Sequence, residues 1–232
     1  METDDLISLL SGIEIERTED GSPTLFVPGL EERYHSNRGA RTESEWVFVR
    51  QGLRTWLQRS GGACTLLEAG FGTGLNALLS LLETMGGGGR ELLYHAYEIN
   101  PLPLPLIREM WQGTLPGEEM TLMEQIHSAE WDVPVRISAS FVLHKHREDL
   151  LTAKLPRADV LYMDAFAPEK TPELWSENFL RKLYEAALPG ARLSTYCAKG
   201  VIRRRLRDLG FRVYRTPGPP GGKREILTAD KD

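Results

Sequence analysis

The pattern of apolar and polar positions divides the chain into strand-like and helix-like segments. Compact apolar runs at 65–69, 91–99, 135–143, 158–164 and 191–196 are typical of buried strands. Between them, composition and helical spacing of apolar residues predict helices near 42–56, 75–82, 104–112, 119–130, 172–188 and 200–209. Strands that alternate with helices predict an α/β fold with a mainly parallel, doubly wound sheet.

The two ends of the chain predict antiparallel elements: an N-terminal hairpin extension and an antiparallel last strand of the sheet. Residues 13–30 form two short alternating runs around Asp20 and Gly21, the pattern of a β-hairpin. Thr42 followed by Glu45 fits a capping box at the start of the next helix. Residues 211–215 and 225–228 predict a last strand pair. We therefore expect a hairpin and helix extension over residues 1–55, followed by one domain over residues 56–232.

Composition is that of a globular chain. Of 232 residues, 41% are apolar, and no apolar run reaches the roughly 18 residues that a membrane-spanning helix needs. The acidic start, residues 1–5, lacks the basic region of a signal peptide. Cys64 and Cys197 lie in apolar surroundings, which favours reduced thiols. These features predict a cytoplasmic protein that does not enter a membrane.

Charge is unevenly distributed along the sequence. Residues 181–232 contain 13 Lys and Arg against 5 Asp and Glu, a net charge of +8, although the whole chain carries −5. A basic C-terminal quarter on an acidic protein suggests a face that meets an anion. The alternative is an ordinary solvated helix face.

The stretch from Glu68 to Asn76 carries the first candidate chemistry. An apolar strand ends in a turn with the order Gly70-x-Gly72-x-Gly74, and an apolar helix follows. A dinucleotide fingerprint would need G-x-G-x-x-G. An acid followed by three alternate glycines is instead the first motif of Rossmann-like S-adenosylmethionine (SAM) methyltransferases. Other nucleotides and a structural turn are the alternatives. The candidate cofactor-binding residues here are Glu68, Gly70, Phe71, Gly72, Thr73, Gly74 and Asn76.

Glu98 ends the second predicted strand, about two dozen residues after the glycine turn. That separation is close to the one expected for an acid that binds ribose hydroxyls. The alternative is an exposed Glu at a strand end. Ligands of such sheets bind at the carboxyl ends of the strands, so we expect the glycine turn, Glu98 and Asp164 to share one rim.

Residues 164–175, the segment after the fourth strand, carry a family resemblance. Their sequence, Asp-Ala-Phe-Ala-Pro-Glu-Lys-Thr-Pro-Glu-Leu-Trp, resembles that of the MnmC/MnmD-type tRNA methyltransferases. Residues 34–44, residues 68–76 and residues 223–225 agree with the same family. The resemblance covers residues 13–229 and implies a class I SAM-dependent methyltransferase.

The resemblance also implies a reaction. The family transfers a methyl group from SAM to the amine of 5-aminomethyluridine, or its 2-thio form, at the tRNA wobble position. The chain ends before a second glycine fingerprint, so we expect no FAD oxidase domain and a precursor made by separate enzymes. Asp164 is then the catalytic residue, which orients the amine and accepts a proton in transit. The alternative is an Asp that caps the following turn.

Aromatic and basic side chains are candidates for substrate binding. Phe166 and Trp175 have flat faces that can stack on a base, although core packing explains Trp175 equally well. Basic residues that could contact phosphates of the anticodon stem-loop are Lys199, Lys223 and Arg224, with Arg203, Arg204, Arg205 and Arg207.

The sequence departs from the family at Lys145-His146, where Gly-Asp is common and the acid approaches adenine. Glu148 and Asp149 follow closely and could take that role. His144 and His146 have no metal-ligand partner at useful spacing, so the sequence predicts no metal. Two other functions remain open: an N-methyltransferase or aminopropyltransferase of a small amine, and a non-catalytic RNA-binding protein.

Overall fold

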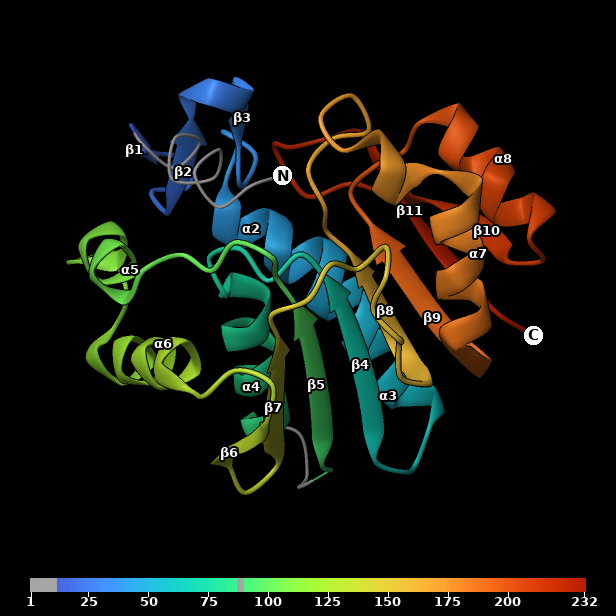
Figure 1. The fold of residues 1–232 in the computed structure, drawn as a ribbon, viewed down its shortest axis with the longest axis horizontal. Coiled ribbons are helices and arrows are strands. Elements are labelled where there is room, and N and C mark those ends of the chain that lie inside the picture. Colours follow the sequence, from blue (N-terminus) through green and yellow to red (C-terminus); the bar gives the residue numbers. More distant parts are fainter. Residues whose placement is uncertain (1–11, 87–89) are drawn as a thin grey trace.

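Within the residues that the structure describes, the protein has an eight-stranded main sheet and a three-stranded N-terminal sheet (Figure 1). The computed structural model describes residues 12–86 and 90–232; residues 1–5, used above for the signal-peptide argument, lie outside them. The main sheet has the order β10-β11-β9-β8-β4-β5-β7-β6. Its strands are β4 (Cys64–Ala69), β5 (Leu92–Tyr97), β6 (Pro134–Ser138), β7 (Phe141–His146), β8 (Ala158–Met163), β9 (Ala187–Thr195), β10 (Arg212–Pro217) and β11 (Glu225–Asp230).

The centre of the sheet is parallel and its two edges are antiparallel. β4 pairs in parallel with β5 and β8, and β7 and β9 extend this arrangement outward. β11 is antiparallel to β9 and to β10, which confirms the predicted antiparallel end. The single strand predicted at 135–143 is wrong: the segment is a hairpin of β6 and β7. The polar residues Ser138 and Ser140 stand at its turn, so apolarity alone did not show the reversal.

Helices cover both faces of the sheet, and alternate strand residues enter two different cores. Leu66 and Tyr94 pack with α4 (Leu75–Gly86), α5 (Leu104–Trp111) and α6 (Gly117–Ser128). Leu67 and Leu161 pack on the opposite face with α7 (Glu177–Ala186) and α8 (Gly200–Asp208). This is the doubly wound arrangement that the alternating pattern predicts.

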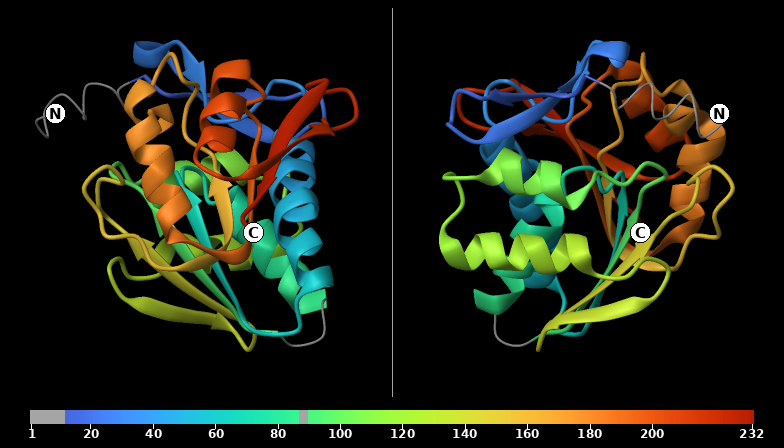
Figure 2. Two further views of the ribbon diagram at one scale, coloured as in Figure 1. Left: turned by 90° about the vertical axis from the view of Figure 1, so that its right-hand side faces the viewer. Right: turned by 60° about the vertical axis from the view of Figure 1, so that its left-hand side comes forward.

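The N-terminal sheet lies beyond the carboxyl ends of the parallel strands (Figure 2). It contains β1 (Glu14–Arg17), β2 (Pro23–Val27) and β3 (Glu32–Arg33). A short 3-10 helix, η1 (Pro28–Leu30), connects β2 to β3. The hairpin is confirmed, while the two-residue β3 was not predicted. Next comes one helical run: α2 (Ala40–Ser44), the π-helix η2 (Glu45–Arg54) and α3 (Thr55–Arg59). The predicted boundary at residue 55 falls within this run and stays a prediction.

Two helix starts differ from the sequence prediction. The helical run begins at Ala40, so Thr42 is not its cap; the carboxylate of Asp20 accepts hydrogen bonds from the backbone N–H and the hydroxyl of Thr42 instead. The helix predicted at 172–188 is divided into a 3-10 turn, η3 (Pro172–Trp175), and α7. Ser176 separates them because its hydroxyl caps α7 by accepting from the N–H of Phe179.

In the part of the chain that is described, we find no helix with the length and apolar character required to cross a bilayer. Cys64 and Cys197 are both buried free thiols, as their apolar surroundings predict.

Candidate active site

A cavity of about 1230 Å³ opens at the carboxyl ends of β4, β5 and β8. A site for one small ligand usually occupies about 300–1,000 Å³, so this cavity has room for two ligands side by side. The predicted site residues that line it are Gly70, Phe71, Gly72, Thr73, Asn76, Glu98, Asp164, Phe166, Lys199, Lys223 and Arg224. Glu68 and Gly74 do not line it: Glu68 is fully buried beneath the cavity floor, and Gly74 faces His127.

The turn between β4 and α4 depends on its three glycines. Gly70, Gly72 and Gly74 all have positive φ values, of 98°, 50° and 72°, which L side chains rarely adopt. A Cβ on Gly70 would lie 2.8 Å from the backbone oxygen of Asp164. A Cβ on Gly74 would lie 2.8 Å from Nε2 of His127. The glycines therefore let the backbone turn tightly past Asp164 and His127, and the turn is closed by hydrogen bonds from the N–H of Phe71 to the Tyr97 oxygen and from the N–H of Gly74 to the Phe71 oxygen.

Glu98 is held against this turn. Its Oε2 accepts a hydrogen bond of 3.0 Å from the backbone N–H of Gly72, and its Oε1 accepts one of 2.9 Å from the N–H of Asn100. Burial raises the pKa of Glu98, although these backbone donors oppose the rise. Both oxygens retain further lone pairs, so the carboxylate can still accept from a ligand hydroxyl in the cavity.

Asn76 connects the buried Glu68 with the half-buried Asp164. From the first turn of α4, its Nδ2 donates to Oε1 of Glu68 at 2.9 Å and to Oδ2 of Asp164 at 2.7 Å. Oδ1 of Asn76 is buried and has no hydrogen-bond partner among the described residues, while Oε2 of Glu68 has the Tyr94 hydroxyl beside it. A buried atom such as Oδ1 is costly to leave unpaired, which is a reason to expect a polar ligand or water beside it.

The electrostatics of the site favour protonated acids. Burial, and next the negative charge of Glu43, raises the pKa of Asp164 to about 7, while the Asn76 hydrogen bond and Lys223 oppose the rise. Burial, and next the charge of Asp164, raises the pKa of Glu68 well above its usual value. Asp164 therefore changes protonation state near neutral pH, the range in which a general base is most useful.

Residues from three distant segments surround Asp164. Lys223, in the loop before β11, places its Nζ 3.1 Å from Oε1 of Glu43 and 3.9 Å from the ring centroid of Tyr196. The Tyr196 hydroxyl donates to the backbone oxygen of Ala165 at 2.8 Å. Glu43, Tyr196 and Lys223 all line the cavity, and together they enclose its Asp164 end.

The two aromatic candidates have different positions. Phe166 lines the cavity, and its ring makes an edge-to-face contact with Tyr34, with centroids 5.1 Å apart. Trp175 is 1% exposed and packs in the core beneath α7, with its Nε1 donating to the backbone oxygen of Phe166 at 2.7 Å. Of the two readings left open for Trp175, core packing is therefore the one observed.

The basic candidates also divide into two groups. Lys199, Lys223 and Arg224 line the cavity, whereas the four arginines of α8 do not. Arg205 donates to the backbone oxygen of Trp175 at 2.6 Å, a structural contact. Much of the remaining positive charge of the C-terminal quarter is paired with acids: Arg192 with Asp230, Arg212 with Asp232, and Arg215 with Glu225.

Lys145 and His146 do not take part in the cavity. Lys145 is 1% exposed on the opposite face of the sheet, where its Nζ donates to the backbone oxygen of His127 at 2.7 Å. Glu148 and Asp149 line the cavity, so either can reach a ligand there, as the sequence suggested.

Sequence reasoning about the site missed Tyr34, His35, Glu43, Lys170 and Tyr196, all of which line the cavity. Tyr34, His35 and Glu43 lie in a segment that the family resemblance included but gave no role. Tyr196 follows β9, and the rule that ligands bind at carboxyl ends of strands could have found it. Lys170 lies in the loop after β8, which the same rule points to.

The chain is similar to known proteins in both sequence and fold. Residues 117–232 match the model of a family described as S-adenosyl-L-methionine-dependent methyltransferase. The chain is 31% identical, over 94% of its length, to the tRNA 5-methylaminomethyl-2-thiouridine biosynthesis bifunctional protein MnmC of Paracidovorax citrulli. It is 29% identical, again over 94% of its length, to the protein of that name from Pseudomonas fluorescens. The chain spans about a third of the length of these curated relatives, 35% and 34% respectively.

Among solved structures, the fold is similar to that of MnmC2 from Aquifex aeolicus. The TM-score is 0.72 and the sequence identity 26%, over 99% of this chain and 77% of the other.

Proposed function

This chain belongs to the S-adenosyl-L-methionine-dependent methyltransferase family, and we propose that it methylates a wobble uridine of tRNA. The acceptor is the primary amine of 5-aminomethyluridine or its 2-thio form. The products are 5-methylaminomethyl(-2-thio)uridine and S-adenosylhomocysteine. The observation that supports the proposal is the half-buried Asp164, whose pKa is raised to about 7, at one end of a cavity that begins at the glycine turn. The names of the similar MnmC proteins indicate the substrate class.

The residues around the glycine turn fit SAM. The turn of Gly70, Gly72 and Gly74 forms a cradle that Cβ atoms would fill, and the carboxylate of Glu98 stands beside it to accept from ribose hydroxyls. Phe71 and Thr73 line the cavity at the same edge. Asn76 lines the cavity and is hydrogen-bonded to the buried Glu68 beneath it. The Oδ1 atom of Asn76, which has no partner among the described residues, can accept a hydrogen bond from a donor of the cofactor. Glu148 and Asp149 are the acids available for the adenine amino group.

Asp164 has the position and the pKa for handling the acceptor amine. SAM supplies an electrophilic methyl group on a sulfonium. A free alkylammonium resembles Lys, with a pKa of about 10.4, so the neutral amine at pH 7 costs roughly 4–5 kcal/mol in water. A dry cavity reduces that cost because desolvation disfavours the ammonium. The Asp164 carboxylate would accept an N–H of the neutral amine and orient its lone pair toward the methyl group. As the C–N bond forms, the C–S bond of the sulfonium breaks and S-adenosylhomocysteine leaves, and Asp164 takes the proton that the methylated ammonium releases.

The nucleoside and the tRNA backbone have candidate partners on the same cavity. Phe166 presents a ring against Tyr34, a surface on which a base can stack. Lys199, Lys223 and Arg224 line the cavity and would contact phosphates of the anticodon stem-loop, the two lysines in place of their ion pairs with Glu169 and Glu43. Arg204 and Arg207 on α8 are exposed, so they extend this basic surface outside the cavity.

The proposal implies other enzymes. The aminomethyl group must be installed before methylation, and we propose that separate enzymes do this. A tRNA substrate places the reaction in the cytoplasm.

A methyl-transfer assay with purified protein tests the proposal. tRNA that carries 5-aminomethyl-2-thiouridine is incubated with SAM, and the digested nucleosides are analysed by mass spectrometry. We expect a gain of one methyl group on the wobble nucleoside. Asp164→Asn serves as the inactive comparison.

Methylation of small amines with no reaction on tRNA would instead support the small-molecule N-methyltransferase. Absence of SAM binding in isothermal titration would support a non-catalytic RNA-binding protein.

Salt dependence tests the basic surface. Replacing Lys199, Lys223 or Arg224 by Ala should lower the salt slope of tRNA binding by about 0.7 for each phosphate contact that is lost. Arg212→Ala is the matched control, because Arg212 is exposed, paired with Asp232 and does not line the cavity. Equal slopes for all four variants would contradict tRNA contact at the cavity.

A further inference from the structure

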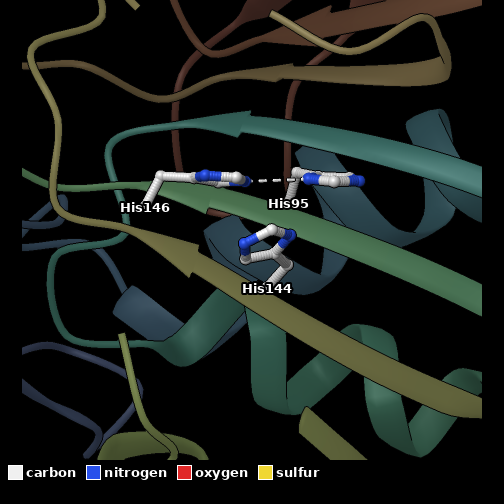
Figure 3. A group of neighbouring side chains, drawn as sticks. All are labelled: His95, His144 and His146. Carbon is white, nitrogen blue, oxygen red and sulfur yellow. Dashed lines mark hydrogen bonds between the residues drawn. The ribbon is translucent and has the colours of Figure 1, made fainter. Parts of the chain in front are cut away.

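Three histidines gather on one face of the main sheet (Figure 3). His144 and His146 lie two residues apart on β7, so their side chains point to the same face. In the parallel register, His95 of β5 is the partner of His144, and Tyr97 is the partner of His146. About 50 residues separate His95 from the other two, which is why sequence spacing predicted no metal partner for them.

The imidazole nitrogens of these residues converge. One ligand nitrogen from each of the three rings lies within 4.8 Å of the others. Nδ1 of His95 and Nε2 of His146 are 2.9 Å apart, and the rings of His144 and His146 have centroids 3.9 Å apart. Three nitrogens at 2.0–2.1 Å from one tetrahedral ion lie about 3.3 Å from each other. The observed cluster therefore needs only small side-chain rotations to hold an ion.

The surroundings fix the rings while leaving them reachable. The pairing of β5 with β7 places His95 directly beside His144. The ring of Tyr97 stacks on His146, with centroids 4.3 Å apart. No helix of the described chain follows β7 before β8; residues 147–157 form a loop there, whereas α7 and α8 cover β8 and β9. His95 is 8% exposed, and His144 and His146 are half-buried. An ion can thus enter from solvent and be bound by groups that are already ordered.

The chemistry of the donors selects the kind of ion. Imidazole binds zinc, copper, nickel and cobalt, whereas magnesium and calcium prefer oxygen ligands. Without an ion, the His95–His146 contact uses only one donor and one acceptor of the three rings, and it gives no role to His144.

We propose that His95, His144 and His146 bind one divalent transition-metal ion of the zinc class, with water at the fourth position. The site is independent of the proposed methyl transfer. It joins β5 to β7, the strands whose following residues, Glu98, Glu148 and Asp149, line the cavity. The ion would therefore stiffen the wall of the cavity on the cofactor side.

Titration with Zn²⁺ tests the proposal directly. Tag-free protein, first treated with a chelator and dialysed, is titrated with Zn²⁺ by calorimetry at pH 7.5. We expect one equivalent bound with micromolar or tighter affinity, and an affinity at least 100-fold weaker for His144→Gln and for the pair His95→Gln with His146→Gln. His127→Gln is the matched control, because it removes a histidine outside the cluster and should bind like the parent protein.

Two further measurements use the parent protein, so their results do not depend on whether the variants fold. Co²⁺ bound to the parent protein should give visible absorption bands of a four-coordinate ion, and crystals soaked in Zn²⁺ should give an anomalous peak between the three rings. The proposal is overturned if the parent protein binds no stoichiometric Zn²⁺, if the folded cluster variants bind as tightly as the parent, or if the anomalous peak lies elsewhere.

Discussion

Asn76 donates a hydrogen bond of 2.7 Å from Nδ2 to Oδ2 of Asp164, across 88 residues of sequence. The same Nδ2 donates to Glu68, so the first turn of α4 ties together acids at the ends of β4 and β8. Both carboxyl groups accept from the same amide nitrogen, so the orientation of the Asn76 amide and the positions of the two acids depend on one another. A residue of the glycine-turn segment therefore orients the Asp164 side chain. This hydrogen bond links the proposed cofactor end of the cavity to the proposed acceptor end.

Removing this hydrogen bond should change the pH dependence of the reaction. Asn76 lowers the pKa of Asp164, so Asn76→Ala should raise that pKa further. If the ionised carboxylate is the active form, the rise of the single-turnover rate with pH moves to higher pH, and the rate at pH 7 falls by roughly 10-fold or more. A pH profile that coincides with that of the parent protein would exclude a positioning role for Asn76.

Replacing Asp164 itself should separate chemistry from cofactor binding. For Asp164→Ala we expect methyl transfer to fall by at least about 10²-fold, the usual contribution of a positioned acid or base. SAM affinity, measured by calorimetry, should change by only a few-fold. Asp208→Ala is the control, because Asp208 is exposed on α8 and outside the cavity. A single-turnover rate of Asp164→Ala near that of the parent would remove Asp164 from the mechanism.

Asp164 should also reduce stability at high pH. Its folded-state pKa of about 7 lies above the unfolded value near 4, so the folded protein holds a proton that the unfolded chain has released. The free energy of unfolding therefore falls as pH rises from about 4 to 7, by at most about 4 kcal/mol. Asp164→Asn removes this loss, so urea unfolding should show the variant to be more stable than the parent at pH 8 and similar to it at pH 4. A pH-independent difference would mean that the Asp164 charge has no such effect.

Glu43 and Lys223 should shift the same titration in opposite directions. The negative charge of Glu43 raises the pKa of Asp164 and the positive charge of Lys223 lowers it. Glu43→Gln should thus move the rise of rate with pH to lower pH, and Lys223→Met should move it to higher pH. Single-turnover profiles of both variants measure the shifts. If both variants moved the rise of the rate in the same direction, the charges of Glu43 and Lys223 would not be what sets the pKa of Asp164.

The glycine turn should not tolerate even one methyl group. Gly70→Ala places a side chain at a φ of +98° and a Cβ 2.8 Å from the Asp164 backbone oxygen, which cannot move alone. The left-handed conformation alone costs about 1–2 kcal/mol, so we expect at least ~2 kcal/mol of lost stability together with weaker SAM binding. Gly62→Ala is the matched control, since it meets nothing within 4 Å and has no left-handed φ. Equal urea midpoints for both variants would contradict the close packing of the turn.

The sequence predicted the parts of the site that depend on local order along the chain. A strand, three alternate glycines and a helix specify the turn at 70–74 because only glycine adopts those backbone angles readily. Strand ends locate Glu98 and Asp164, because parallel strands bring their carboxyl ends to one rim. The hairpin at 134–146 was missed because its turn carries no Gly or Pro signal, and Thr42 was misread as a cap because its real partner, Asp20, lies 22 residues away.

The amino-acid sequence by itself determined the doubly wound sheet, the glycine turn and the family, since each follows from periodicity or a contiguous motif. Only the tertiary structure decided which side chains meet: Asn76 with Asp164, Lys223 with Glu43, and His95 with His144 and His146. These contacts join residues from separate strands and loops, and their geometry depends on register and packing. That geometry, through burial and neighbouring charge, also sets the pKa of Asp164 near neutrality.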